Sequence, residues 1–379
     1  MKILMICNAD LCSKESLGVI KKINGQYKAF NNLGCETYLA CLKNGNAILK
    51  HRGTERVIIK RRKKTVLTVF AMFKSLPELV TEESIDVCYI RYPLADLTFI
   101  KMLKQLHEIS SVVIEMPTFP YDQQASNNRN IVSQFNLMQD KHYRKSLKKY
   151  VNYFATYGNQ KTIYDVQCIG IKNGIDVSSI KYLGDKLNYN DTVNLIGVAR
   201  IQRDHGYDRI IEGLKNYYND SNLPKEKIYF HIVGKGEAEK ELREKVQNYC
   251  LDEYVIFHGV KSGEELEQLY LTSNIGVGVL GAYRSGSNST SALKDKEYCA
   301  VGIPIIGSVP DNTIPESVGY YKLFDNNDSP VDMNEIIDYF NFIKENPELH
   351  KQLRILAENE LSWERQLNII ISALKNMYS

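Results

Sequence analysis

The sequence predicts an α/β protein made of two doubly wound parallel-sheet domains. Short apolar segments that suit strands alternate with longer segments whose apolar residues recur at helical spacing. Strands that alternate with helices form parallel sheets covered on both faces. The length of 379 residues exceeds what one hydrophobic core accommodates, and the apolar fraction of 44% is that of an ordinary globular protein. We therefore expect two domains.

The first half of the chain opens with a strand at 3–7, followed by a helix that Gly34 ends. The apolar residues of this helix are spaced for one face and are Ile20, Ile23, Tyr27, Phe30 and Leu33. Further strands are predicted at 87–90 and 112–114. These segments form the first predicted domain, residues 1–170.

The second half repeats this pattern after a turn at Asn173-Gly174. The second predicted domain therefore covers 171–361, and the amphipathic helix at 362–379 is expected to cross back onto the first. The expected strands of the second domain lie at 193–198, 228–233, 255–257, 275–279 and 303–306. If the two sheets face each other, ligands bind between them at the carboxyl ends of the strands.

The charge is distributed unevenly between the halves. Residues 1–170 hold 25 Lys and Arg against 14 Asp and Glu, a net charge of +11. The remaining residues hold 23 against 31, a net charge of −8. A basic first half suggests an anionic surface or substrate as its partner.

Two basic runs carry much of this charge, one from Lys60 to Lys64 and one from Lys141 to Lys149. Each is either a solvated face or a site of peripheral contact with anionic lipid, where a cation contributes about 1 kcal/mol. Nucleic acid is a weaker third option, because no nucleic-acid motif accompanies the charge.

Location in the cell is predicted from three features of the chain. The apolar start is too short for a signal peptide, and no apolar run reaches the length of a membrane span. The eight cysteines stand apart without a C-x-x-C pair and are expected to be reduced. A cytoplasmic protein, peripheral to the inner face of the membrane, is the resulting expectation.

The stretch from Ser289 to Gly307 holds the most informative candidate site. A loop of small residues opens a helix, whose free N–H groups and positive dipole end suit a phosphate. The donor-side candidates here are Ser289, Thr290, Ser291, Ala292, Leu293 and Lys294. Glu297, further along the helix, suits ribose or sugar hydroxyls; the alternative is a surface acid that balances Lys294 and Lys296. The combination predicts a nucleotide-sugar site.

Two further candidates follow strands of the second half. Arg200 would leave a strand end and form two hydrogen bonds with a diphosphate, with His205 as a second donor. The alternatives are a surface ion pair for the arginine and a structural role for the histidine. Gly234 and Lys235 lie in a Gly-x-Gly turn that either admits a nucleotide or is simply a tight connection.

The first half contributes one donor-side candidate, Gly18, and three candidates on the acceptor side. Gly18 lies where the first strand passes to the first helix, a place for phosphate approach. Glu115, Thr118 and Tyr121 follow a strand in a loop stiffened by two prolines, which is an active-site position in a doubly wound sheet. A structural turn is the alternative.

No metal or cofactor is expected. The chain contains no Asp-x-Asp pair of the kind that holds a divalent cation in many sugar transferases. Neutralisation of a diphosphate would then depend on Arg200, His205 and helix N-termini.

In this order the motifs resemble those of the retaining glycosyltransferases of family four, which have the GT-B fold, and of their capsule and surface-polysaccharide branch. The resemblance runs over nearly the whole chain. The matching segments are Asn173-Gly-Ile-Asp176, Gly197 to Gly206, Val233-Gly-Lys-Gly-Glu237, Val255-Ile-Phe-His-Gly259 and Glu297-Tyr-Cys-Ala-Val-Gly-Ile-Pro-Ile305.

The resemblance implies a role for each site residue. Arg200 would bind the diphosphate and Glu297 the ribose, the backbone from Ser289 to Leu293 would hold phosphate, and Gly18 would line the cleft. Two positions depart from the family pattern. His205 stands where a lysine is usual and must donate as neutral imidazole or be charged by the diphosphate, and Ser289 stands where a glutamate is usual.

The resulting hypothesis is a metal-independent retaining glycosyltransferase that moves a sugar from a nucleoside diphosphate sugar to a lipid-linked surface glycan. One alternative is an isomerase on the same fold that is similar to the nucleotide-sugar 2-epimerases, for which Glu115 is the best additional acid. The other is a non-catalytic binding partner with the same fold.

Overall fold

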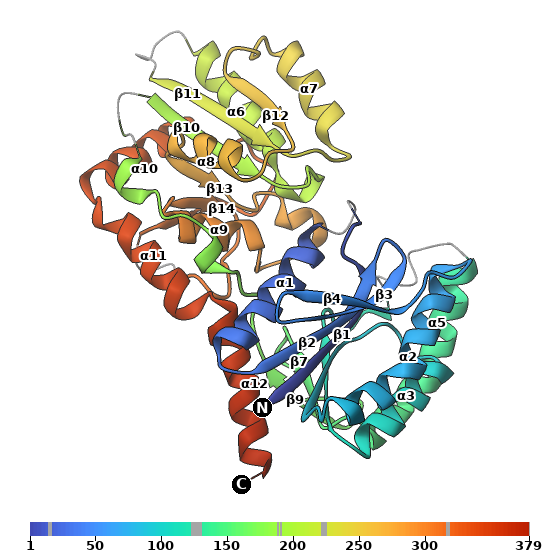
Figure 1. The fold of residues 1–379 in the computed structure, drawn as a ribbon. Helices are drawn as coiled ribbons and strands as arrows, with labels where there is room; N and C mark the ends of the chain where they lie inside the picture. Colours follow the sequence, from blue (N-terminus) through green and yellow to red (C-terminus); the bar gives the residue numbers. More distant parts are fainter. Residues whose placement is uncertain are drawn as a thin grey trace. The chain divides into compact units, whose positions relative to one another are not determined.

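The computed structural model describes residues 1–13, 17–122, 131–187, 189, 192–220, 226–315 and 319–378. The chain divides into two compact units, which are described separately (Figure 1). The first comprises Met1–Lys172 with Trp363–Ser379, and the second Asn173–Ser362. The predicted division after residue 170 lies close to the observed one after Lys172.

The first unit is built on one sheet with the strand order β4-β3-β2-β1-β5-β6-β7-β9-β8. The strands are β1 (Lys2–Asp10), β2 (Glu36–Lys43), β3 (Asn46–His51), β4 (Thr54–Ile59), β5 (Val87–Arg91), β6 (Ser111–Met116), β7 (Tyr153–Thr156), β8 (Thr162–Ile163) and β9 (Val166–Gly170). The six central strands, in the spatial order β2-β1-β5-β6-β7-β9, pair in parallel. The outer strands β3, β4 and β8 pair antiparallel with their neighbours.

Helices cover both faces of this sheet, because successive residues of a strand point to opposite faces and both faces are apolar. On β1, Leu4 and Ile6 face one core and Ile3 and Met5 the other. The first face is covered by α2 (Thr65–Glu82), α3 (Leu97–His107), α5 (Ile131–Tyr143) and the 3₁₀ helix η2 (Arg144–Lys149). The second is covered by α1 (Leu17–Asn32) and the C-terminal helix α12 (Trp363–Tyr378).

The meander from β2 to β4 was not predicted from the sequence. Asn44 and Gly45 join β2 to β3 with φ angles of 50° and 77°, as a two-residue type I′ turn requires. Arg52 and Gly53 repeat this geometry between β3 and β4, with φ of 46° and 78°. The Asn-Gly pair was the available signal for a hairpin.

Helix α12 packs closely on the first unit. The indole of Trp363 is 1% exposed and lies over Gly25 of α1, where a Cβ atom would come within 2.6 Å of the ring. Asn32 donates to Glu364 at 2.7 Å, and the amide of Lys172 donates to Gln366 at 2.8 Å. The end of the chain is thereby part of the first unit's core.

The second unit has a parallel sheet with the order β12-β11-β10-β13-β14-β15. Its strands are β10 (Thr192–Val198), β11 (Lys227–Val233), β12 (Val255–Gly259), β13 (Ile275–Val277), β14 (Ile305–Gly307) and β15 (Tyr321–Leu323). One face is covered by α6 (Tyr207–Asn219), α7 (Glu239–Asn248) and α10 (Met333–Glu345). The other is covered by α8 (Glu264–Leu271), α9 (Leu293–Val301) and α11 (Glu348–Glu360).

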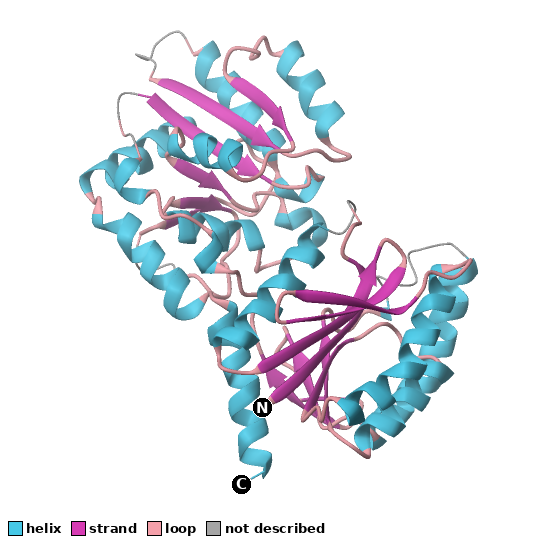
Figure 2. Cartoon of the chain, viewed as in Figure 1, coloured by secondary structure: helices cyan, strands magenta, loops and turns pink. Residues whose placement is uncertain are grey.

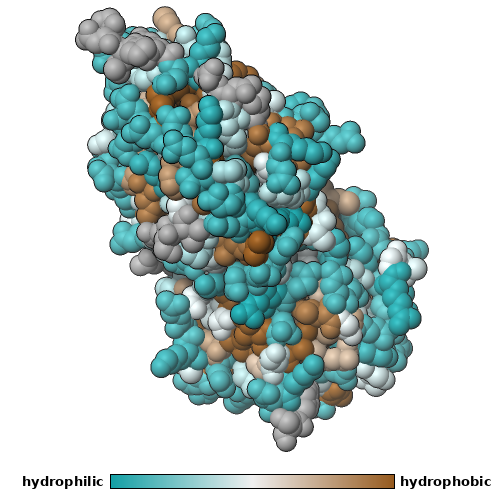
Figure 3. All heavy atoms as spheres, turned by 90° about the vertical axis from the view of Figure 1, so that its left-hand side faces the viewer, coloured by the Kyte–Doolittle hydropathy of each residue, from teal (hydrophilic) through white to brown (hydrophobic). Residues whose placement is uncertain are grey.

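Figure 2 shows helices on both faces of the strands in each unit. The prediction of an α/β protein with two Rossmann-like, parallel-sheet domains is confirmed. The surface shown in Figure 3 is mainly hydrophilic, with apolar side chains gathered in limited patches. Of the helices described, none combines the length and the apolar character that crossing a membrane requires.

Candidate functional site

The loops that follow β10 and β11 run side by side at the carboxyl edge of the second sheet. The amide of Ala199 donates to Val233 at 3.0 Å, and that of Ile201 donates to Lys235 at 3.1 Å. A Cβ atom at Gly234 would lie 1.8 Å from the Ala199 carbonyl, and one at Gly236 would lie 2.0 Å from that of Ile201. The Gly-x-Gly turn is thus required for contact between two loops.

Arg200 and Lys235 present cationic side chains at this edge. Both are exposed, and Arg200 follows the end of β10 by two residues. Among the residues described, the guanidinium of Arg200 makes no ion pair with a surface acid. Two positive side chains are therefore available to an anion here.

His205 ends the 3₁₀ helix η5 (Arg203–His205) in the loop after β10. Its Nδ1 lies 3.3 Å from the amide of Gln202 and accepts that hydrogen, so the ring proton resides on Nε2. Burial, and then the nearby charge of Lys294, lower the pKa of His205 to about 3. His205 is therefore a neutral imidazole at pH 7 that donates through Nε2–H.

The loop after β13 packs against the His205 segment. The amide of Leu280 donates to the His205 carbonyl at 3.1 Å. Gly206 has a φ of 68° and touches this loop so closely that a Cβ atom would come within 2.6 Å of the Gly281 nitrogen. The backbone around His205 is held on both sides.

The loop before α9 contributes backbone amides to the same edge. The amide of Thr290 is already used, because it donates to Pro310 at 2.9 Å, and Asn312 donates to the Ser289 hydroxyl at 3.3 Å. Ala292 is the N-cap of α9 and provides no capping side chain. The first-turn amides of Leu293 and Lys294 therefore lack an intrahelical acceptor, which favours an anion.

Three consecutive charged side chains of α9 are buried, contrary to the interpretation of the lysines as surface groups. Lys294 donates to the Gly278 carbonyl at 2.8 Å, and Lys296, fully buried, binds Asp311 at 3.1 Å. Burial lowers the pKa of Lys294 to about 8 and raises that of Asp295 to about 6. Lys294 is therefore not an exposed ligand. Its charge affects the site by lowering the pKa of His205.

Glu297 is half-buried on α9, and its neighbour Tyr298 ties the helix to β10. The amide of Val198 donates to the Tyr298 hydroxyl at 2.9 Å, and that hydroxyl donates to Ile196 at 3.1 Å. Burial, and then the charge of Glu297, raise the pKa of the Tyr270 hydroxyl well above its usual range. Glu297 therefore belongs to a helix that Tyr298 ties to the end of β10, the strand that Arg200 follows. The sequence did not indicate the role of Tyr298.

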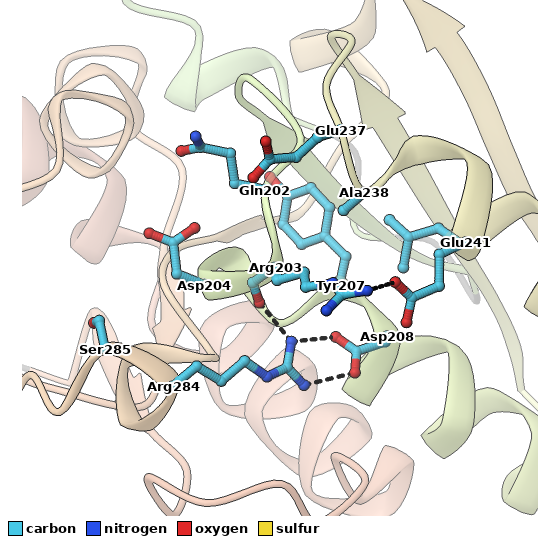
Figure 4. Close-up of a pocket in the computed structure, with 11 residues that line it drawn as sticks. Gln202, Arg203, Asp204, Tyr207, Asp208, Glu237, Ala238, Glu241, Arg284 and Ser285 are labelled. Carbon is cyan, nitrogen blue, oxygen red and sulfur yellow. Dashed lines mark hydrogen bonds and ion pairs between the residues drawn. The ribbon is translucent and has the colours of Figure 1, made fainter. Parts of the chain in front are cut away.

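A hollow of about 710 Å³ lies next to this edge (Figure 4). Its charged lining consists of Arg203, Asp204, Asp208, Glu237, Glu241 and Arg284. Arg203 binds Glu241 and Arg284 binds Asp208, at 2.9 and 2.6 Å. Carboxylates outnumber the guanidinium groups, which are paired, so this hollow does not suit a diphosphate.

In the first unit, Glu115 is the centre of a buried network and not a group presented to a ligand. Its carboxylate lies 2.9 Å from Lys22 Nζ, from an Arg91 nitrogen and from the Tyr157 hydroxyl, and 3.1 Å from Gln26. Burial by itself would raise the pKa of Glu115, but these cations and donors lower it to about 2. The carboxylate is thus ionised, and its contacts link α1, β5 and β6.

The other first-unit candidates lie around the same edge of that sheet. Tyr121 is buried and donates to the fully buried Asp140 at 2.6 Å, so its hydroxyl is not presented to an acceptor as predicted. Thr118 is exposed in the loop after β6, and Gly18 is exposed in the first turn of α1. Of the acceptor-side candidates, Thr118 alone offers an exposed polar side chain.

The structure therefore brings Arg200, His205, Lys235 and the start of α9 to one sheet edge, because they follow β10, β11 and β13. Glu297 lies further along α9. Within the described ranges, no group of three His, Cys, Asp or Glu side chains gathers closely enough to hold a metal ion.

A family model matches most of the second unit. Residues 182–360 match the family model described as glycosyl transferases group 1. This match covers the six-stranded region and both of its helical layers. No curated protein sequence matches the chain.

Solved structures resemble the whole chain at low sequence identity. A glycosyltransferase from Rickettsia africae ESF-5 is 12% identical with a TM-score of 0.66, covering 100% of this chain and 98% of its own. Sucrose-phosphate synthase from Thermosynechococcus elongatus is 14% identical with a TM-score of 0.63, covering 100% and 99%. The catalytic domain of starch synthase IV from Arabidopsis thaliana, bound to ADP and acarbose, is 12% identical with a TM-score of 0.60, covering 96% of each chain. The chain has the GT-B glycosyltransferase fold.

Proposed function

We propose that the chain is a retaining glycosyltransferase of family four that moves a sugar from a nucleoside diphosphate sugar to a lipid-linked surface glycan. The observation that carries the proposal is the gathering of Arg200, the neutral donor His205 and the N-terminus of α9, the helix that carries Glu297, at one sheet edge. The match of residues 182–360 to group 1 glycosyl transferases supports it.

Stabilisation of the leaving diphosphate is the main catalytic task. Arg200 and Lys235 are exposed cations, and His205 adds an Nε2–H whose direction the Gln202 contact determines. Donors that are held in place before the reaction stabilise charge as it develops, without reorganisation. These groups also neutralise the diphosphate without a metal, and we propose that none is required.

Glu297 is proposed to accept hydrogen bonds from the ribose hydroxyls of the donor. The Tyr298 link keeps it near the end of β10, and the first amides of α9 face a phosphate group in this arrangement. Ser289, engaged by Asn312, takes the place where a glutamate is usual in the family, so recognition of the sugar relies on other groups.

In the transfer step, one bond at the anomeric carbon of the sugar breaks and another forms in its place. The bond from this carbon to the diphosphate oxygen breaks with its electron pair leaving on the diphosphate. The acceptor hydroxyl oxygen bonds to the same face, and its proton passes to a diphosphate oxygen. The products are a glycan lengthened by one sugar and a nucleoside diphosphate.

The basic first unit is proposed to bind the acceptor. Thr118 is its exposed candidate, whereas Glu115 and Tyr121 support the local structure through the buried contacts described above. Gly18, which is also exposed, is proposed to contact the donor. The runs from Lys60 to Lys64 and from Lys141 to Lys149 are proposed to meet anionic lipid, which would place the enzyme at the inner face of the cell membrane.

Glu115 counts against the epimerase alternative. A general base works best with a pKa near the operating pH. The pKa of Glu115 is lowered to about 2, and each of its contacts is a cation or a hydrogen-bond donor. Removal of a sugar-ring proton by this side chain is therefore disfavoured.

The test is a panel of UDP-, GDP- and dTDP-sugars, scored first by thermal shift and then by nucleotide release with a glycan-lipid extract as acceptor. Acceptor-dependent release in the presence of EDTA is expected for one donor class. A new epimer formed from donor alone would establish the isomerase instead, and donor binding without turnover would indicate a non-catalytic partner.

A further inference from the structure

Helix α5 presents large apolar side chains to solvent. Ile131, Val132, Phe135 and Met138 are 82%, 62%, 52% and 61% exposed, although α5 is only 13 residues long. Exposed apolar residues are ordinary when they are scattered singly. Four of them within two turns of one helix form a continuous surface that needs an explanation.

The apolar residues lie on the side of α5 that points away from the core. At 3.6 residues per turn, Ile131, Phe135 and Met138 fall within an arc of about 60°. The buried positions, Leu137 and Asp140, lie on the other side of the helix. A surface helix normally turns polar residues outward, so the outer face of α5 has the opposite polarity to that expected.

The same layer of helices carries further apolar groups at the same end. Helices α2, α3 and α5 cover one face of the sheet (Figure 1). Each of α2 and α3 begins at the carboxyl edge, because β4 and β5 run in the same direction as the parallel strands. Their first turns expose Val66, Leu67 and Leu97 at 48%, 41% and 46%.

Cations border this apolar surface and outnumber the acids near it, although Lys148 pairs with Asp165 and Arg144 with Asp122. The five residues from Lys60 to Lys64, directly before α2, are all exposed. Lys141, Lys145, Lys148 and Lys149 are exposed at the end of α5 and in η2. From Ile131 to Lys149 the only acid is Asp140, which is buried against Tyr92, Tyr121 and the amide of Ala95.

We propose that the outer face of α5 inserts into an anionic bilayer surface, with Phe135 and Met138 reaching the boundary between head groups and acyl chains. Apolar side chains flanked by lysines are the signature of a helix that lies in the membrane interface. The choice of lipid over a protein partner follows from the surplus of cations around the apolar face. The inference rests on the proposed function only in that a lipid-linked acceptor gives the contact a purpose.

The experiment is flotation of the full chain, without donor, on vesicles of phosphatidylcholine with or without phosphatidylglycerol. The wild-type chain is expected to float with the anionic vesicles. Phe135→Ser combined with Met138→Ser should weaken binding by roughly a hundredfold, because several buried methylene equivalents are lost. Ile355→Ser is the matched control and should float normally, because Ile355 is an apolar residue of α11 in the second unit that is 45% exposed.

A direct probe is Phe135→Trp, read against the buried Trp363, which is the only tryptophan of the chain. Its emission should shift to shorter wavelength with anionic vesicles and be quenched by brominated acyl chains. Absence of quenching, or equal flotation of the serine double variant, would overturn the proposal. A wild-type dimer that the double variant converts to a monomer would instead assign the face to a second copy.

These outcomes are independent of catalysis. Flotation without any transfer activity would refute the proposed function and leave the membrane contact standing. Transfer to a soluble acceptor by a chain that does not float would support the proposed transferase activity and refute the membrane contact. Unchanged nucleotide release by the serine double variant with a soluble acceptor would show that its fold is intact.

Discussion

The hydroxyl of Tyr298 accepts a hydrogen bond from the amide of Val198 at 2.9 Å, which joins helix α9 to the end of β10. Residue 298 follows Glu297, and Arg200 lies two residues beyond Val198. One buried contact therefore holds the proposed ribose acid near the strand from which the proposed diphosphate-binding arginine leaves.

Replacing Tyr298 by Phe should lower both stability and donor affinity. The Val198 amide and the Ile196 carbonyl would lose the hydroxyl as a partner, where Tyr298 and Ile196 are fully buried and Val198 is half-buried. An unsatisfied buried polar group costs about 1–3 kcal/mol. Urea unfolding measures the first effect, and titration with the donor selected from the panel measures the second. An unchanged donor affinity would show that α9 holds its position without this contact.

Arg200→Ala should reduce nucleotide release by roughly a hundredfold to a thousandfold, the usual effect of removing one charge-stabilising donor. Arg203→Ala is the matched control, because the Arg203 side chain is 74% exposed and its guanidinium pairs with Glu241 on the surface. Its rate should remain close to wild type, as surface ion pairs contribute little. If the Arg200 variant keeps its rate, another group stabilises the leaving diphosphate.

His205 should remain neutral throughout the pH range in which the enzyme is assayed. Its pKa is lowered to about 3, so its charge changes only in strong acid. His205→Gln keeps a neutral N–H donor and should retain the shape of the profile of kcat/KM between pH 5 and 9, with a moderate loss of rate. An inflection near pH 6 that disappears in the variant would show that the histidine titrates there.

Glu115→Gln should destabilise the first unit, and the loss should shrink in acid. The pKa of Glu115 is lowered from 4.5 to about 2, so its contribution is complete above pH 4.5 and is lost as the pH falls through 2. Breaking a buried ion pair on one side costs about 3–5 kcal/mol. Urea unfolding at pH 7 and pH 3 compares the two proteins. A pH-independent difference would contradict the assigned ionisation.

The fold was predictable where its signals are local. Alternating strands and helices indicated parallel sheets, and the loops at Arg200 and Gly234 were located by the strands that precede them. The β2–β4 meander was not predicted although Asn44-Gly45 marks a type I′ turn, because its hairpins interrupt the alternation of strands and helices that predicted the rest of the unit.

The candidate site was predictable as a set of positions and not as a set of contacts. In a printed sequence, Lys294 and Glu115 cannot be told from exposed charged residues. In the structure Lys294 is buried beside Gly278 and His205, and Glu115 is buried beside Lys22 and Arg91. Burial of a charge depends on partners that lie far away in the chain, and no local pattern records them.

The sequence by itself determined the two α/β units, the loops that carry Arg200 and His205, and the helix that carries Glu297, because hydrophobic period and glycine placement act over a few residues. Tertiary structure alone decided that Tyr298 binds Val198, that Tyr121 is turned toward Asp140, and that α5 faces outward with its apolar side. These outcomes depend on which distant surfaces pack together, and packing assigns each side chain to core or solvent.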